Sequence, residues 1–190
     1  MIAVATKAVT SKTITAEEFA ELKDPIGGGI LELVKGEIVE MPRPQPIHGY
    51  LCTRFGRIIS NFVEDKKLGW VLGNDTGVIL ERDPDTVRGP DICFFGLEKM
   101  PELPSFYSEF PPDFVIEVRS PSDRPGQIRA KVRVYLNAGV RLIWVADPDS
   151  KSVMAYAGTN RGVEYDENDT LDGGEVLPGF TCKVAEFFGM

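Results

Sequence analysis

The segment from Phe114 to Ala146 constrains the possible folds most, because two short apolar runs flank an amphipathic helix. Residues 114–118 (FVIEV) and 142–146 (LIWVA) have the length and composition of buried strands. Between them, the turn residues 120–123 (SPSD) precede a predicted helix that reaches about Asn137. A strand–helix–strand unit of this kind predicts a sheet with a helix packed on it.

The rest of the chain adds more strands than helices to this unit. Near the N-terminus, apolar periodicity and turn signals predict a short helix that Thr15 and Glu18 cap, and then a β-hairpin over 30–41 that turns at Lys35-Gly36. A helix follows from about Ile47 to Lys66. After it, the sequence predicts strands over 70–80 and 91–95, joined by the turn-rich residues 81–90, and a closing hairpin over 152–157 and 162–166. The predicted fold class is therefore α/β, or α+β mixed, with a central mixed β-sheet flanked by helices and preceded by an N-terminal helix and β-hairpin.

Length and composition fit one globular domain. The chain has 190 residues, of which 43% are hydrophobic and 26% are charged, as in ordinary soluble proteins. We expect residues 1–12 to form a flexible N-terminal arm and residues 13–190 to form a single domain. No signal peptide and no apolar run near the ~20 residues of a membrane span are visible. The three cysteines form no CxxC pair, so we expect a cytoplasmic protein without a disulfide framework or a cysteine zinc site.

The charge of the chain bears on its partners. Lys and Arg number 21 and Asp and Glu number 29, a formal net charge of −8, which argues against a protein that coats DNA through phosphate contacts. Residues 117–141, however, hold six basic and two acidic residues. Because local charge matters more than the total for meeting a phosphate, weak or selective binding of a phosphate-bearing partner stays compatible with the composition.

Two acidic residues stand out by their positions. Asp91 follows Gly89-Pro90 at the start of a predicted strand, where it could point from the sheet edge into a cleft. An isolated Pro-Asp pair, however, is more often part of a turn. Glu117 lies within an apolar strand, and a buried carboxylate is costly unless it is paired or binds a metal. Glu117 could equally form a surface pair with Arg119.

Two further side chains could complete a site. Helical spacing places Lys131 at the border of the inward face of its helix, with Gln127 one turn before it and Tyr135 one turn after it. A lysine there more often covers apolar surface with its stem. His48, the only histidine, falls on the apolar face of its helix. It could be a hydrogen-bonded core residue, a metal ligand or a proton-transfer group.

Together these residue types suggest one chemistry. Two carboxylates on neighbouring strands can hold a hard divalent cation such as Mg²⁺, which prefers oxygen ligands and keeps several waters. One such water can become the nucleophile while the cation offsets charge on a phosphate. A nearby Lys or Arg can position the water or stabilise the transition state. The combination predicts phosphodiester hydrolysis.

The order of these residues resembles a known superfamily. The spacing from Pro90-Asp91 to Glu117 and a basic residue two positions later is similar to that of the PD-(D/E)XK nucleases. More narrowly, residues 13–189 resemble a large bacterial restriction-endonuclease-like family. The motifs that carry this resemblance are ELVKGEIVEM, PxPxxH, RGPDICFF, DFVIEVRSPSD, KVRVYLNAGVRLIWVADP and LPGF.

The resemblance implies a restriction-endonuclease-like core and a Mg²⁺-dependent DNA endonuclease, with Mn²⁺ as a substitute and no organic cofactor. Asp91, Glu117 and the main-chain carbonyl of Val118 match the metal ligands of the superfamily. The usual lysine two residues after the glutamate is Arg119, which is always protonated and cannot act as a base. The family supplies its lysine from the following helix, here Lys131. We expect Lys131 to position the attacking water and Arg119 to offset phosphate charge.

Three accessory residues and two alternatives complete the prediction. Glu32 and His48 match recurring positions of the family and, with Gln127, are expected to be accessory site residues. We also expect a homodimer, because cutting both DNA strands takes two sites. Alternatively, the chain could be a catalytically inactive binding or assembly module that keeps the nuclease fold. It could also hydrolyse another phosphodiester, such as RNA.

Overall fold

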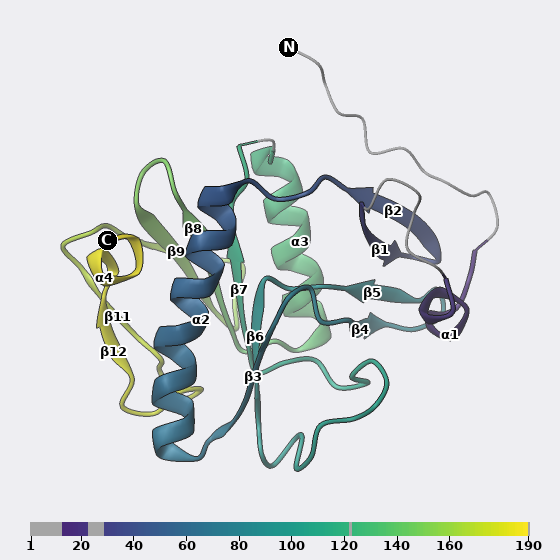
Figure 1. Ribbon diagram of the computed structural model, residues 1–190, viewed down its shortest axis with the longest axis horizontal. Coiled ribbons are helices and arrows are strands. Elements are labelled where there is room, and N and C mark those ends of the chain that lie inside the picture. Colours follow the sequence, from purple (N-terminus) through teal and green to yellow (C-terminus); the bar gives the residue numbers. More distant parts are fainter. Residues whose placement is uncertain (1–12, 23–28, 122, 190) are drawn as a thin grey trace.

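A computed structural model describes residues 13–22, 29–121 and 123–189 of the chain. The predicted arm over residues 1–12 lies outside the described residues. Figure 1 shows a large β-sheet with helices on both of its faces and a smaller sheet beside it. Within the described residues, no helix combines the length and the apolar character that crossing a membrane requires.

The larger sheet has six strands in the spatial order β10-β9-β8-β7-β6-β3. Its strands are β3 (Gly69–Gly73), β6 (Ile92–Gly96), β7 (Phe114–Val118), β8 (Leu142–Asp147), β9 (Ser152–Ala157) and β10 (Val163–Tyr165). β7 and β8 are parallel and are joined through α3 (Pro125–Ala138), whereas the other neighbours are antiparallel. The predicted strand–helix–strand unit and the mixed sheet are therefore confirmed.

The smaller sheet is antiparallel, in the order β2-β1-β5-β4. Its strands are β1 (Ile30–Val34), β2 (Glu37–Met41), β4 (Val78–Glu81) and β5 (Thr86–Arg88), and α1 (Ala16–Ala20) packs against them. The predicted hairpin is confirmed, since Lys35 and Gly36 join β1 to β2 with the positive φ values that a type I′ turn needs. The capping box is confirmed too, because Thr15 and Glu18 exchange both hydrogen bonds.

Helices and a second hairpin cover the two faces of the larger sheet. One face packs against α2 (Pro46–Lys66), α4 (Val184–Phe188) and the hairpin of β11 (Thr170–Asp172) and β12 (Thr181–Lys183), and the other packs against α3 and β4. Phe55 of α2 stacks on Phe187 of α4 with ring centroids 4.2 Å apart. Because β7 is central and both faces are covered, all of its residues are buried, which explains its nearly unbroken apolar character.

The single strand predicted over residues 70–80 is wrong, because two strands of different sheets lie there. Asn74 and Asp75 have positive φ values of 61° and 54°. This left-handed conformation cannot continue a strand, so the chain leaves the larger sheet after Gly73 and enters the smaller sheet at Val78. The break places Asn74 and Asp75 beside the cavity described below.

The turn-rich residues 81–90 also contain a strand that local composition does not reveal. β5 pairs with β1, with Val87 opposite Leu33. This contact joins residues that are distant in the sequence, so only the folded chain brings them together. The predicted helix over residues 47–66 and the closing hairpin over 152–157 and 162–166 are confirmed by α2 and by β9 and β10.

Candidate functional site

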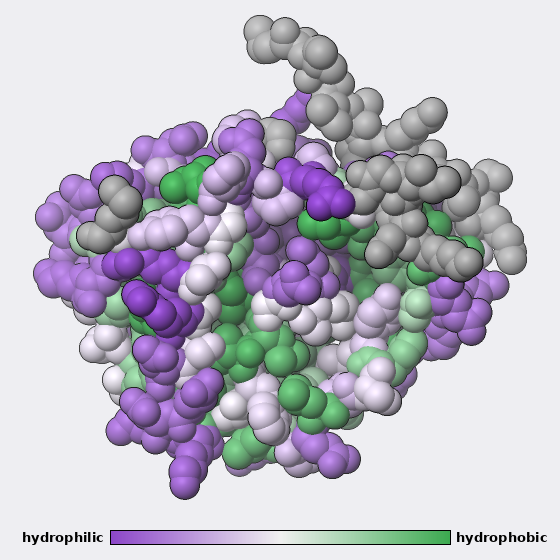
Figure 2. Space-filling view, in the orientation of Figure 1, coloured by the Kyte–Doolittle hydropathy of each residue, from purple (hydrophilic) through white to green (hydrophobic). Residues whose placement is uncertain are grey.

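A cavity of about 530 Å³ opens at the end of β7, between α2, α3 and the smaller sheet. Figure 1 shows the upper parts of α2 and α3 and the β1–β2 hairpin around this region, and Figure 2 shows hydrophilic and hydrophobic residues side by side there. Most of the predicted site residues line the cavity: Glu32, His48, Asp91, Glu117, Val118, Gln127 and Lys131. Arg119 is not among the described residues that line it.

Asp91 and Glu117 lie at the same end of two neighbouring strands. β6 and β7 pair antiparallel, with Ile92 opposite Ile116, so Asp91 just before β6 meets Glu117 near the end of β7. Asp91 Oδ2 accepts a hydrogen bond of 2.7 Å from the main-chain N–H of Val118. The antiparallel register therefore holds the Asp91 carboxylate against β7, on the rim of the cavity.

Glu117 is buried and contacts two side chains of α3. Its Oε2 lies 2.7 Å from Lys131 Nζ, and its Oε1 accepts a hydrogen bond of 2.6 Å from the Tyr135 hydroxyl. Lys131 and Tyr135 are four residues apart, one helical turn, so they reach the same carboxylate from one face of α3. The predicted placement of Lys131 at the border of the inward face is confirmed.

Burial controls the charge of this pair. Burial raises the pKa of Glu117 to about 7, although the ammonium of Lys131 acts in the opposite direction. Burial also opposes the charged form of Lys131, but the carboxylates of Glu117, Glu32 and Asp91 outweigh it, so the pKa of Lys131 is raised. Lys131 is therefore a cation near neutral pH, whereas Glu117 stands close to its titration point.

A second ion pair lies behind Lys131. Glu32 of β1 is 3% exposed and forms an ion pair with Arg88 of β5 through Oε2 and Nη1. The other oxygen of Glu32, Oε1, lies 3.8 Å from Lys131 Nζ. Arg88 also lines the cavity, and its Nε is buried without a hydrogen-bond partner. Two strands of the smaller sheet thus bring a further cation to the cavity.

His48 lies in the first turn of α2 and contacts two other polar side chains. Its Nε2 is 3.3 Å from Asp91 Oδ2, and its Nδ1 is 3.3 Å from Cys52 Sγ. The hydrogen bond with Asp91 raises the pKa of His48 above its ordinary value, although burial acts against it. His48, Cys52 and Asp91 each offer one ligand atom within 4.8 Å of the others.

The arginines of the basic segment do not gather at the cavity. Arg119 forms an ion pair with Asp147 of β8. Arg141 pairs with Asp113, which lies at the opposite end of β7 from Glu117. Arg129 and Arg133 of α3 are exposed and are not among the described cavity residues. Of the described basic residues in the segment 117–141, only Lys131 lines the cavity. The excess of basic residues in this segment is therefore not concentrated at the cavity.

The residues present fit a hard divalent cation. Asp91 and Glu117 offer carboxylate oxygens, the ligands that Mg²⁺ prefers. The raised pKa of Glu117 shows that Lys131 does not fully compensate for its burial, and a cation would supply the missing positive charge. Burial raises the pKa of Cys52 far above its ordinary value, so its neutral thiol would be a poorer ligand for such a cation than the carboxylate oxygens.

The comparisons with known proteins agree with this geometry. The Uma2 family, described as "Putative restriction endonuclease", matches residues 16–185. The chain belongs to this family. The crystal structure of "a putative nuclease" from Anabaena variabilis superposes with a TM-score of 0.79 at 20% sequence identity, covering 92% of this chain and 97% of that chain. This likeness confirms the restriction-endonuclease-like fold. No curated protein matched the chain.

Two residues of this Uma2-family site were not predicted as site residues from the sequence. Helical spacing places Tyr135 one turn after Lys131, which signals a shared partner but does not by itself mark Tyr135 as a site residue. Arg88 lies in the segment that local composition assigns to a turn. In the sequence, the β-branched neighbours Thr86 and Val87 are the one local signal of a strand there.

Proposed function

We propose that this Uma2-family protein is a metal-dependent endonuclease that hydrolyses phosphodiester bonds of DNA. One observation carries the proposal: Asp91 and Glu117 lie together at the ends of adjacent strands, inside a cavity, with the ammonium of Lys131 against Glu117. Membership of the family supports nuclease chemistry. The divalent cation and the DNA substrate belong to the proposal.

Asp91, Glu117 and the main-chain carbonyl of Val118 would hold Mg²⁺, with Mn²⁺ as a substitute. When bound, the cation supplies Lewis acidity and makes a water more acidic. Asp91 is already oriented by the N–H of Val118, and Glu117 by the hydroxyl of Tyr135. These hydrogen bonds limit the rotamers of both carboxylates before any ion arrives, which lowers the cost of ordering the site.

Lys131 provides hydrogen-bond donors and positive charge rather than a base. Because the neighbouring carboxylates raise its pKa, its ammonium stays protonated and donates to an oxygen of the attacking water or of the phosphate. In the reaction, the water oxygen forms a bond to phosphorus, one ester P–O bond breaks, and the proton of the water ends on the leaving oxygen. Positive charge at the cavity stabilises the charge that develops on the phosphate.

Plasmid cleavage tests the proposal directly. We expect purified protein with Mg²⁺ or Mn²⁺ to nick or linearise supercoiled DNA, and Asp91→Asn and Glu117→Gln to lose at least about 100-fold of this activity. Glu164→Gln is the matched control, because it replaces a carboxylate in β10, four strands from β6 in the same sheet. Cleavage that survives in both site variants would overturn the proposal.

The same preparation separates the proposal from its alternatives. RNA and nucleotides tested beside DNA reveal whether another phosphodiester is preferred. A catalytically inactive module gains support from the arginines paired away from the cavity; it predicts neither cleavage nor Mn²⁺ binding. The proposed homodimer is checked by light scattering, where a monomer at micromolar concentration would contradict it.

A further inference from the structure

Arg88 occupies a position that the proposed chemistry does not yet use. Its guanidinium lines the cavity and is largely buried, at 14% side-chain exposure. Among the described residues, Glu32 is its one side-chain ion-pair partner, and its Nε has no hydrogen-bond partner. A buried charge with an unmatched donor is costly and calls for an explanation.

We propose that Arg88 is a positioning residue which, by binding Glu32, keeps the ammonium of Lys131 on Glu117. This inference rests on the proposed function and deepens it, because it assigns a task to a residue that does not touch the proposed cation. The four side chains Glu32, Arg88, Glu117 and Lys131 are called the cavity network below.

The proposal follows from the place of Lys131 between two carboxylates. Lys131 Nζ lies 2.7 Å from Glu117 Oε2 and 3.8 Å from Glu32 Oε1. Both carboxylates are almost fully buried, with side-chain exposures of 8% and 3%, so each attracts a cation strongly. Lys131 is therefore the nearest alternative cation for Glu32, and its flexible stem allows the ammonium to cross the short distance between them.

Arg88 prevents Glu32 from competing with Glu117 for Lys131, because the Arg88 guanidinium forms an ion pair with the Glu32 carboxylate. With Arg88 in place, Glu32 is neutralised by a side chain whose charge does not depend on pH. Without it, Glu32 would be a buried carboxylate with Lys131 as its remaining cation among the described residues. The ammonium would then move toward Glu32, and Glu117 would lose the donor that the proposed hydrolysis needs beside the phosphate.

The neighbouring strands make Arg88 specific for this task. Val87 lies opposite Leu33 in the antiparallel pair of β5 and β1, which sets Arg88 beside Glu32. Arg82 lies in the same β4–β5 hairpin and also pairs with carboxylates, but it is not among the described cavity residues. Arg82→Met is therefore the matched control for Arg88→Met.

A crystal structure of metal-free Arg88→Met protein tests the positioning role without any nuclease assay. We expect Lys131 Nζ to lie closer to Glu32 than to Glu117, whereas Arg82→Met keeps the native arrangement. Lys131 that stays on Glu117 in Arg88→Met would overturn the inference. This result is independent of whether the protein cleaves DNA, so a failed positioning role and a failed proposed function are distinguished.

Kinetics and a second variant complete the test. We expect Arg88→Met to lower kcat about 10- to 100-fold, as for residues that orient catalytic groups, with KM nearly unchanged. Adding Glu32→Gln removes the competing charge, so the double variant should recover most of the lost kcat. A raised KM with no recovery in the double variant would show instead that Arg88 contacts the substrate, and would overturn the inference.

Variants that conserve charge balance keep the test decisive if Arg88→Met does not fold. Arg88→Lys retains the cation, and Glu32→Gln/Arg88→Met removes the pair together. Both should keep Lys131 on Glu117 in metal-free crystals. Displacement of Lys131 in either protein would overturn the inference, because neither leaves Glu32 charged and without its strand partner.

Discussion

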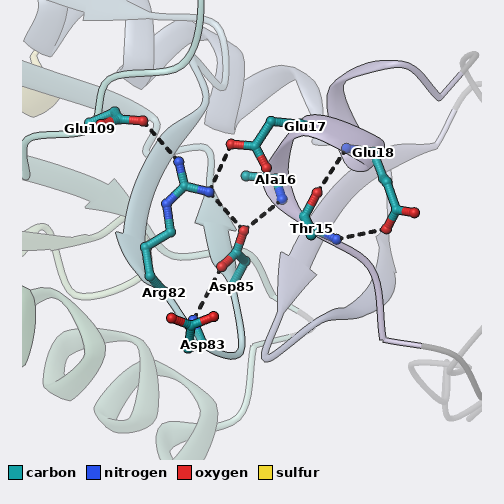
Figure 3. A network of polar contacts seen from close by, with 8 residues as sticks. All are labelled: Thr15, Ala16, Glu17, Glu18, Arg82, Asp83, Asp85 and Glu109. Carbon is teal, nitrogen blue, oxygen red and sulfur yellow. Dashed lines mark hydrogen bonds and ion pairs between the residues drawn. The ribbon is translucent and has the colours of Figure 1, made fainter.

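The β4–β5 hairpin carries two arginine–carboxylate networks that differ in burial and in how completely their polar atoms are paired. Near its turn, Arg82 joins Glu17, Asp85 and Glu109, a set called the α1 network (Figure 3). At the far end of β5, Arg88 joins Glu32 in the cavity network. The two arginines are six positions apart and have similar chemical partners.

The α1 network is fully paired and, apart from the buried Asp85, exposed. Arg82 is 38% exposed and lies 2.9 Å from each of its three carboxylate partners. Asp85 also accepts hydrogen bonds from the main-chain N–H groups of Ala16 and Asp83, at 2.8 and 3.2 Å. The ion pair of Glu17 and the N–H of Ala16 tie α1 to the β4–β5 hairpin, and Glu109 ties the loop between β6 and β7 to it. The network is therefore structural, and its exposed pairs contribute little stability.

The cavity network is buried and incompletely compensated. Glu117 has a raised pKa, Arg88 Nε has no partner, and Lys131 is shared between two carboxylates. Strongly perturbed titrating groups in a cavity are typical of functional sites. The candidate site is therefore separated from a structural contact by the burial of its charged groups and by their incomplete pairing, not by its residue types.

The largest expected difference between the two networks concerns catalysis. We expect Lys131→Met to lower DNA cleavage at least about 100-fold, because it removes the donor and positive charge beside Glu117. Arg82→Met should leave cleavage within about twofold, since surface substitutions away from a site change little. Equal losses in the two variants, measured as kcat/KM on one plasmid, would erase the functional distinction.

The next effect is the pH dependence of metal binding. Burial raises the folded-state pKa of Glu117 to about 7 from an ordinary 4.5, so its proton competes with a cation below that pH. We expect Mn²⁺ affinity to fall about tenfold per pH unit below 7, for one competing proton. Calorimetry at pH 6, 7 and 8 measures this, and Glu117→Gln should lack the slope. A flat wild-type profile would show that Glu117 is not a ligand.

The raised pKa of Glu117 also determines the direction in which the free energy of unfolding changes with pH. For a carboxyl whose pKa rises on folding, the stabilising contribution is complete below the unfolded pKa and is lost as pH rises through the folded pKa. Metal-free protein should therefore lose stability relative to Glu117→Gln between about pH 4.5 and pH 7. Denaturant unfolding of both proteins across this range checks the sign, and the opposite trend would mean that Lys131 overcompensates for burial.

A smaller effect is expected in the α1 network. Asp85→Ala should lower the free energy of unfolding by about 1–3 kcal/mol, because a buried acceptor of two main-chain N–H groups and Arg82 is lost, while cleavage stays unchanged. Burial opposes ionisation of Asp85, but these hydrogen bonds outweigh it and its pKa is lowered. The contribution is therefore present above the unfolded pKa and is lost as pH falls through the folded pKa. Loss of cleavage in well-folded Asp85→Ala would contradict its structural role.

The smallest effect is expected at the rim of the α1 network. Glu109 is 67% exposed, so Glu109→Gln should change the free energy of unfolding by less than about 0.5 kcal/mol and leave cleavage unchanged. Urea denaturation beside the wild type measures the difference. A loss as large as that of Asp85→Ala would show that exposure does not limit the contribution of this network.

Features set by local geometry could be predicted from the sequence. The capping box of Thr15 and Glu18 and the turn at Lys35-Gly36 depend on neighbouring residues, and helical phase alone places Lys131 on the side of α3 that reaches Glu117. Asp91 and Glu117 were recognised through their motif. Their meeting at one end of the sheet depends on the antiparallel register of β6 and β7.

Features set by long-range pairing could not be predicted. The residues 70–80 divide between two sheets because Asn74 and Asp75 leave the strand conformation, a choice that their types permit but do not impose. Arg88 enters the site only through the pairing of β5 with β1. Arg119 pairs with Asp147 at the ends of two neighbouring strands. This ion pair holds Arg119 away from the cavity, although the sequence predicts it beside the phosphate.

Crystals soaked with Mn²⁺ show whether Asp91 and Glu117 form an oxygen-ligand cation site. Anomalous difference maps locate the ion without any assumption about substrate. We expect a peak bound by the carboxylates of Asp91 and Glu117 and by the carbonyl of Val118. No peak in the cavity, or a peak held only by His48, Cys52 and Asp91, would contradict it.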